Sequence, residues 1–281
     1  DAHLHIFFSF EKGELVYQSL LEETIPGQMA SFLKYGVTTI KSLNDPLDFV
    51  LALRKKLQEG QTQGPRLLTV GPAFTAPNGH PAVTLAADDP WLRKQMVIEV
   101  DDPEMAREKV CEIASKNVDA IKLIYQGGQM ETIGKTVVVQ KLSIDVMQAV
   151  IDEAHKRNLR ATVHTWNEED SIDALNAGAD GIEHGLVGIH PSGDSLAHLL
   201  NEKKAFFVPT LQILRSSTNK EKLPIAMKNL KELSDKGVLI ALGTDMNCAF
   251  QTGGLVEIEE MELMQQAGLT PNQIIVAATG N

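Results

Sequence analysis

The sequence has few cysteines and no long apolar run. Cys111 and Cys248 are too few for a disulfide framework, and their separation excludes the close pairing of a thiolate zinc site. No apolar stretch approaches the roughly 20 residues that a membrane-spanning helix needs. The sequence therefore argues against a disulfide-stabilised scaffold and against a transmembrane helix.

Positive charge is also scarce. The 26 lysines and arginines are outnumbered by 37 acidic residues, and the formal net charge is -11. Because the acidic residues are dispersed along the chain, no basic surface for nucleic acid is expected. A small-molecule substrate is the expected partner, and assembly into a homo-oligomer stays open.

The remaining composition is that of a globular protein, with 43% hydrophobic and 22% charged residues. An α/β barrel of about 250 residues commonly forms one domain, so residues 1–281 are expected to form one domain. The chain starts at Asp1 without an initiator Met. An upstream segment that includes a signal peptide is therefore compatible with the sequence, and the cytoplasm is only the default location.

Short apolar runs alternate with longer amphipathic stretches along the chain, which is typical of a parallel sheet. Helical spacing of apolar residues is clear over 103–117, 143–157 and 222–236, with Ser143 as the expected N-cap of the second and Gly237 as the expected C-cap of the third. Eight strands with interleaved helices predict an α/β fold of the (β/α)8 TIM-barrel type. The predicted strands are 3–7, 36–42, 66–71, 119–124, 160–165, 181–185, 206–211 and 238–244.

Two connections are longer than usual. Residues 72–100 follow the third predicted strand, and such a loop commonly belongs to the active-site face of a barrel. Residues 126–141 alternate enough to suggest a short hairpin after the fourth strand. Both connections, together with the residues after Asp245, are expected to shape the pocket.

The first predicted strand carries the motif His3-Leu4-His5. Side chains alternate across a strand, so the two imidazoles lie on the same side and can hold one metal ion. An isolated motif of this kind is weak, because two polar residues at a strand end are equally common.

Further ligand-type residues stand in other predicted strands. His164, His184 and Asp245 end the fifth, sixth and eighth, and Lys122 lies within the fourth. Burial without a partner would cost about 1 to 3 kcal/mol for a neutral polar group and more for a charge. A shared metal site at the carboxyl ends of the strands removes that cost, and this is where barrel enzymes carry their active sites.

In this order, these residues resemble the binuclear members of the amidohydrolase superfamily. The likeness covers the whole chain through GVTTIKSLND, GPRLLTVGP followed by NGH, IEHG, VPT, GTD and the closing EEMELMQQAGLTPNQIIVAAT. These segments are similar to the branch that contains imidazolonepropionase-like and Xaa-Pro or Xaa-Arg dipeptidase-like enzymes. Members usually add a small β-sandwich, whose segments are absent from this chain.

The resemblance implies two divalent metal ions, with zinc as the default. It assigns His3, His5 and Asp245 to a more buried α ion, and His164 and His184 to a more exposed β ion. Imidazole and carboxylate ligands suit zinc but also tolerate manganese, cobalt and iron. The identity of the metal therefore stays open.

The resemblance also implies the chemistry. Lys122 would carry a carbamate derived from carbon dioxide that bridges the ions, because an ammonium cannot ligate a cation. A hydroxide bridging the ions would attack the carbonyl carbon of an amide, with a dipeptide as the favoured substrate. Asp245 would act as general base and then as general acid toward the leaving nitrogen.

Three further residues are candidate substrate contacts. The branch commonly has a histidine at the position of His80, which would orient substrate or stabilise the oxyanion, although a loop histidine is often merely solvated. Tyr125 and Arg215 would meet a substrate carboxylate, although Tyr125 could equally pack on the barrel rim. An exposed arginine is also common.

Other ionisable residues are left out of the predicted site. Glu183 is expected to face away from His184 toward the helical layer, and Glu260 is expected to be surface charge on an acidic helix. No ligand or nucleophile role is expected for a set of residues in helical or loop contexts, namely His155, His190, His198 and Cys248.

Two alternatives to a binuclear amide hydrolase remain. A mononuclear deaminase of the same superfamily would not need Lys122 as a bridge. A barrel that has lost catalysis and serves as a scaffold would typically lack one or more of the six ligand-type residues, and it would purify without metal.

Overall fold

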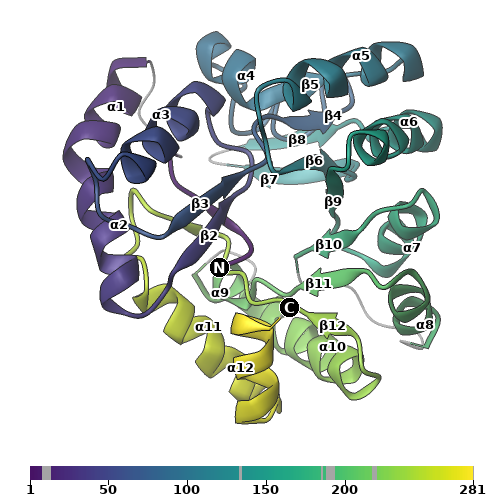
Figure 1. Ribbon diagram of the computed structural model, residues 1–281. Helices are drawn as coiled ribbons and strands as arrows, with labels where there is room; N and C mark the ends of the chain where they lie inside the picture. The colour runs from purple at the N-terminus through teal and green to yellow at the C-terminus, as the bar shows by residue number, and fades with distance from the viewer. Residues whose placement is uncertain (8–13, 133–134, 185, 188–193, 217–219, 281) are drawn as a thin grey trace.

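A ring of parallel strands forms the centre of the computed structural model, and helices surround it (Figure 1). The model describes residues 1–7, 14–132, 135–184, 186–187, 194–216 and 220–280. The chain is an α/β protein of the (β/α)8 barrel type, as the sequence predicted. Each of the eight predicted strands is present: β1 Leu4–His5, β2 Thr39–Ser42, β3 Arg66–Thr69, β6 Ala120–Ile124, β9 Arg160–His164, β10 Gly181–Glu183, β11 Phe206–Val208 and β12 Leu239–Ile240.

The strands pair in two parallel sheets, ordered β13-β1-β2-β3 and β12-β11-β10-β9-β6-β4-β5. Strand β3 pairs with β2, and β4 (Ala73–Thr75), three residues further on, pairs with β6. Gly71 lies in the bend between them with a φ of 70°, a conformation that favours glycine. The chain therefore passes from one sheet into the other just after the third predicted strand, and this passage forms one seam of the barrel.

The eighth predicted strand forms the second seam. Strand β12 pairs with β11, and β13 (Met246–Asn247) pairs with β1. Between them, the Ala2 amide donates a hydrogen bond to the Leu242 carbonyl oxygen at 2.8 Å. Both ends of the chain consequently lie near the ring of strands (Figure 1).

Helices follow the strands and form the outer layer. Ser143 caps α6 through the Val146 amide, and Gly237 follows the end of α10 with a φ of 74°, as predicted. The helices are α1 Glu14–Ser19, the π-helix η1 Leu20–Thr24, α2 Ile25–Lys34, α3 Leu47–Gln58, α4 Pro90–Met96, α5 Pro103–Ala114, α6 Ile144–Lys156, α7 Glu168–Asn176, α8 Asp194–Lys203, α9 Leu211–Ser216, the 3-10 helix η2 Lys220–Lys222, α10 Leu223–Asp235, α11 Leu255–Gln266 and α12 Pro271–Thr279.

The two long connections contain regular structure. The segment 72–100 includes β4, helix α4 and β5 (Val97–Glu99), which pairs with β4. After β6, the antiparallel strands β7 (Gly128–Thr132) and β8 (Lys135–Val139) form the hairpin that the alternation suggested.

Alternation along the strands separates an apolar outer layer from a polar interior. On β6, Ile121 and Leu123 belong to a large buried apolar cluster shared with the helices, whereas Lys122 between them faces the other way. Burial of this apolar layer, at about 25 cal/mol per Å², is the main stabilisation of such a fold. Among the described residues, no helix has the length and apolar character to cross a membrane.

Candidate metal centre

Four imidazoles converge where the central strands end. The ring centroids of His164 and His184 are 4.4 Å apart, those of His3 and His184 are 4.7 Å apart, and those of His3 and His5 are 5.7 Å apart. His3, His164 and His184 are each no more than 5% exposed. Since each comes from a different strand or strand end, the parallel order of the barrel places them together.

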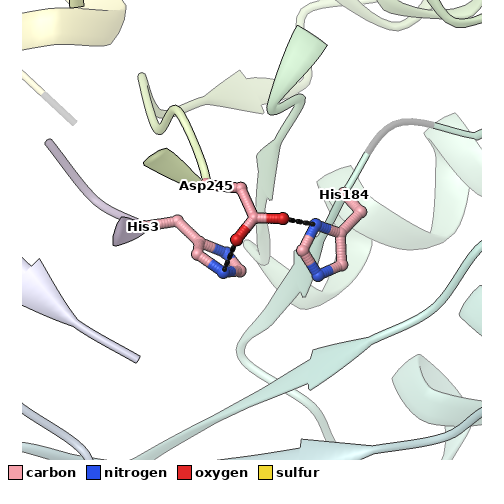
Figure 2. A group of neighbouring side chains, drawn as sticks. All are labelled: His3, His184 and Asp245. Carbon is pink, nitrogen blue, oxygen red and sulfur yellow. Dashed lines mark ion pairs between the residues drawn. The ribbon is translucent and has the colours of Figure 1, made fainter. Parts of the chain in front are cut away.

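The carboxylate of Asp245 lies among these imidazoles (Figure 2). Its Oδ1 is 3.3 Å from His3 Nε2 and 3.1 Å from His5 Nε2, and its Oδ2 is 3.6 Å from His184 Nδ1. Burial disfavours the charged form, but the neighbouring His3 and His5 hold the pKa of Asp245 well below its usual range. Asp245 is therefore a carboxylate at neutral pH.

The backbone keeps Asp245 in this position. Its φ is 54°, in the left-handed region, and its amide donates a hydrogen bond to the His3 carbonyl oxygen at 2.8 Å. A non-glycine residue in this region is strained by about 1 to 3 kcal/mol, and such strain is common at functional sites. The bond to His3 joins the end of the eighth strand to the start of the first.

The geometry can hold a cation. One ligand atom from each of His3, His184 and Asp245 lies within 4.8 Å of the other two, and imidazole nitrogen with carboxylate oxygen is a donor set that suits zinc. This group does not correspond to either ligand set implied by the resemblance, because His3 was assigned to the α ion and His184 to the β ion. In the same structure, His164 Nε2 is 2.8 Å from the Gln126 side-chain oxygen.

Lys122 lies in the barrel interior on β6. Its side chain is buried, and within the described part of the chain its Nζ has no hydrogen-bond partner. Burial, assisted by the charge of Lys41, lowers the pKa of Lys122 from 10.5 to about 8, although Glu183 and Asp245 oppose that shift. An appreciable fraction of this amine is therefore neutral near pH 7.

His80 also lies beside the imidazole group. Its ring centroid is 5.5 Å from that of His164, and its Nδ1 is 2.7 Å from Thr84 Oγ1. Burial lowers the pKa of His80 to about 4, so its ring is neutral at pH 7. The structure thus brings His80 to the predicted site from the long connection after β3.

The sequence pattern of the Amidohydrolase family matches residues 1–281. This chain belongs to the Amidohydrolase family. Ochratoxinase from Aspergillus niger is 23% identical over 276 residues, which cover 89% of this chain and 55% of that protein. The chain thus spans about half the length of the curated relatives it matches.

Solved structures of amidohydrolase-like enzymes show the same fold. A Xaa-Pro dipeptidase with bound methionine in its active site superposes with a TM-score of 0.80 at 23% identity, covering 99% of this chain and 72% of that one. The structure of A. niger ochratoxinase has a TM-score of 0.77 at 19% identity, covering 100% of this chain and 70% of that one. Molinate hydrolase has a TM-score of 0.76 at 19% identity, covering 99% and 70%.

In this amidohydrolase barrel, Glu183 does not face the helical layer, so that prediction was wrong. Its side chain is fully buried in the interior, with Oε2 2.8 Å from His3 Nδ1 and Oε1 3.5 Å from Lys41 Nζ. The prediction assumed that the strand continues through His184. Instead, His184 has a φ of 83°, so β10 ends at Glu183 and the two side chains need not point in opposite directions.

Two predicted substrate contacts lie outside the imidazole group. The Tyr125 side chain, just after β6, packs in the buried apolar cluster shared with the helices, and its hydroxyl donates a hydrogen bond to Asp173 at 3.0 Å. Arg215 on α9 is about half exposed and pairs with Glu259 of α11 at 3.0 Å. Each side chain thus has a carboxylate partner outside the imidazole group, and its contact with substrate stays a prediction.

Glu260 is not surface charge, contrary to the prediction. It is fully buried, and its two carboxyl oxygens accept hydrogen bonds from the Leu211 and Gln212 amides at 2.9 and 2.7 Å. It therefore binds the start of α9, and burial raises its pKa to about 8. The acidic run on this helix concealed that one of its faces is buried.

The other residues left out of the site stay outside it where the structure describes them. His155 pairs with Asp180, His198 is exposed near Glu202, and Cys248 is buried with a raised thiol pKa because of burial. The prediction for His190 falls outside the described residues.

Trp166 and Asp45 belong to the surroundings of the site but were not predicted. The Trp166 ring stacks on His184 with centroids 5.0 Å apart. Trp166 follows His164 by two residues, and this spacing could have indicated that both side chains lie on the same side of the chain. The buried Asp45 carboxylate accepts hydrogen bonds from the Ile6 and Phe7 amides, both at 2.9 Å. Asp45 therefore fixes the chain just after the HxH strand.

Proposed function

We propose that this chain is the catalytic barrel of a hydrolase that uses two divalent metal ions, zinc by default, to cleave a C–N bond of a small amide. The observation that carries the proposal is the convergence of the imidazoles with the Asp245 carboxylate in the barrel, together with the buried Lys122 amine, which has no hydrogen-bond partner within the described residues. A buried polar cluster of this size is costly unless a ligand satisfies it.

The ligand-type residues are numerous enough for two ions. Imidazole and carboxylate donors come from the start of the barrel at β1, the end of β9, the residue after β10 and the segment after β12, and His3, His184 and Asp245 already form one compact group. Lys122 fits as the bridge because its neutral amine can add carbon dioxide, and a carbamate would then supply two oxygen donors. Among the described residues, Lys122 Nζ has no hydrogen-bond partner. A carbamate bound to the ions would remove the cost of leaving this buried group unpaired.

Bound divalent ions would supply a water that ionises near neutral pH and a Lewis acid for the substrate carbonyl. Asp245 is a carboxylate at neutral pH, so it can accept a proton in the reaction and deliver it to the leaving nitrogen. That delivery matters because an amide anion is a poor leaving group. His80, neutral at pH 7, can offer one hydrogen bond to the substrate without adding charge.

A dipeptide is the substrate class we propose first, by extension from the Xaa-Pro dipeptidase that shares this fold. A second candidate is a deaminase that uses a single ion. The compact group of His3, His184 and Asp245 favours it, because these residues alone could hold one cation. In that case Lys122 would be dispensable for turnover.

Metal content and hydrolysis of the full-length protein test the proposal together. The protein is purified without chelator, supplied with bicarbonate, and assayed against dipeptides and N-acyl amino acids, with Asp245→Asn as the matched variant. We expect about two metals per chain and a turnover that falls by about 10²- to 10⁴-fold in the variant. One metal with an active Lys122→Met variant would favour deamination, and no metal would favour a scaffold.

A further inference from the structure

We propose that Glu183 is a positioning residue that orients His3 for metal binding, and that Lys41 and Thr162 hold Glu183 in place. This inference rests on the proposed metal centre, but it concerns residues behind the ligands. The four side chains come from four strands or strand ends and form one chain of contacts, in which His3, Glu183 and Thr162 are buried and Lys41 is 15% exposed.

The contact between Glu183 and His3 is direct. Oε2 of Glu183 is 2.8 Å from Nδ1 of His3, and the opposite ring nitrogen, Nε2, is 3.3 Å from Asp245 Oδ1. A carboxylate accepts but does not donate, so it selects the tautomer that carries the proton on Nδ1. That tautomer leaves the Nε2 lone pair free to bind a cation on the Asp245 side.

The other oxygen of Glu183 is held by two donors. Oε1 accepts a hydrogen bond from the Thr162 hydroxyl at 2.6 Å, and Lys41 Nζ lies 3.5 Å away. Glu183 is fully buried, and both of its oxygens have partners, because Oε2 lies against His3 Nδ1 and Oε1 lies against Thr162 and Lys41. The chain of contacts therefore keeps a carboxylate at the back of His3.

The two donors also determine what a Glu183→Gln substitution would do. Because Thr162 and Lys41 both donate toward the position of Oε1, the amide oxygen of glutamine is expected to occupy that position. The amide nitrogen would then face His3 Nδ1 as a donor. His3 would have to accept there and carry its proton on Nε2, where it blocks metal binding.

Metal affinity of the full-length protein, measured by competition with a chelator, is the first test. Glu183→Gln is expected to weaken zinc binding by about 10- to 100-fold. Glu257→Gln is the matched control, because Glu257 is also buried but binds the Gly254 amide at 2.7 Å at the start of α11. Lys41→Met and Thr162→Val should weaken zinc binding in the same direction by smaller factors.

The tautomer of His3, read by ¹⁵N NMR in metal-stripped protein, is the second test and does not depend on metal. We expect a proton on Nδ1 in the wild type and its loss from Nδ1 in Glu183→Gln. A wild-type His3 without a proton on Nδ1, or unchanged zinc affinity in Glu183→Gln, would overturn the inference. A wild type that takes up no zinc would instead overturn the proposed function, and the NMR result would still decide the orientation of His3.

Discussion

Because the amine of Lys122 is buried, the free energy of unfolding should rise as the pH increases from about 8 to 10.5. The informative perturbation is Lys122→Met, studied in metal-stripped protein in buffer free of carbon dioxide. Methionine keeps an unbranched stem of similar length in the barrel interior but has no titrating group. The comparison therefore isolates the charge of one buried amine.

The magnitude follows from the pKa of Lys122, which burial lowers from 10.5 in the unfolded chain to about 8 in the folded protein. Between these values the unfolded chain binds a proton that the folded protein does not, so the free energy of unfolding rises with pH. At about 1.4 kcal/mol per pH unit, the rise totals about 3 kcal/mol. This stabilisation is fully present above pH 10.5 and is lost as the pH falls to about 8.

Urea unfolding of wild type and Lys122→Met at a series of pH values between 7.5 and 10.5 provides the assay. The difference between their free energies of unfolding reports Lys122 together with the effect of its charge on the neighbouring histidines. Lys55→Met is the matched control, because Lys55 is 73% exposed and its removal should leave the pH dependence unchanged. A difference between wild type and Lys122→Met that stays constant over this range would refute the reasoning.

Three substitutions test other parts of the site and its surroundings. His184→Ala should reduce metal content and lower kcat/KM by orders of magnitude with an unchanged circular dichroism spectrum, and wild-type turnover would contradict the proposed ligand role. Tyr125→Phe should leave KM unchanged and lower the free energy of unfolding by about 1 kcal/mol, because the lost hydroxyl binds Asp173. A raised KM would support Tyr125 as a substrate contact. Asp45→Asn should lower the free energy of unfolding in urea by about 1 to 3 kcal/mol, because the asparagine NH₂ group would face the buried backbone amide of Ile6 or Phe7. An unchanged free energy of unfolding would argue that Asp45 does not support the first strand.

Local patterns predicted much of this molecule. The eight strands were visible because apolar β-branched runs alternate with helical spacing, and both periodicities arise within a few residues. The candidate ligands were visible because imidazole, carboxylate and amine groups are rare inside apolar strands.

Glu183 and Glu260 show where local patterns fail. The alternation rule holds only while a strand continues, and β10 ends at Glu183 because His184 adopts a left-handed backbone conformation. Glu260 looked like one more charge on an acidic helix, yet α11 packs against α9, and Glu260 binds the amides at the start of that helix. Neither fact depends on residues close in sequence.

The sequence by itself determined the kind of molecule: strands that must pair in parallel, helices that must cover them, and polar groups that must meet at the carboxyl ends. Only the tertiary structure decided which groups touch. His3 lies between Asp245 and Glu183, which are far from it along the chain, because the barrel closes the last strand onto the first. Distances across the barrel depend on how all of its strands are placed, so no local pattern can specify them.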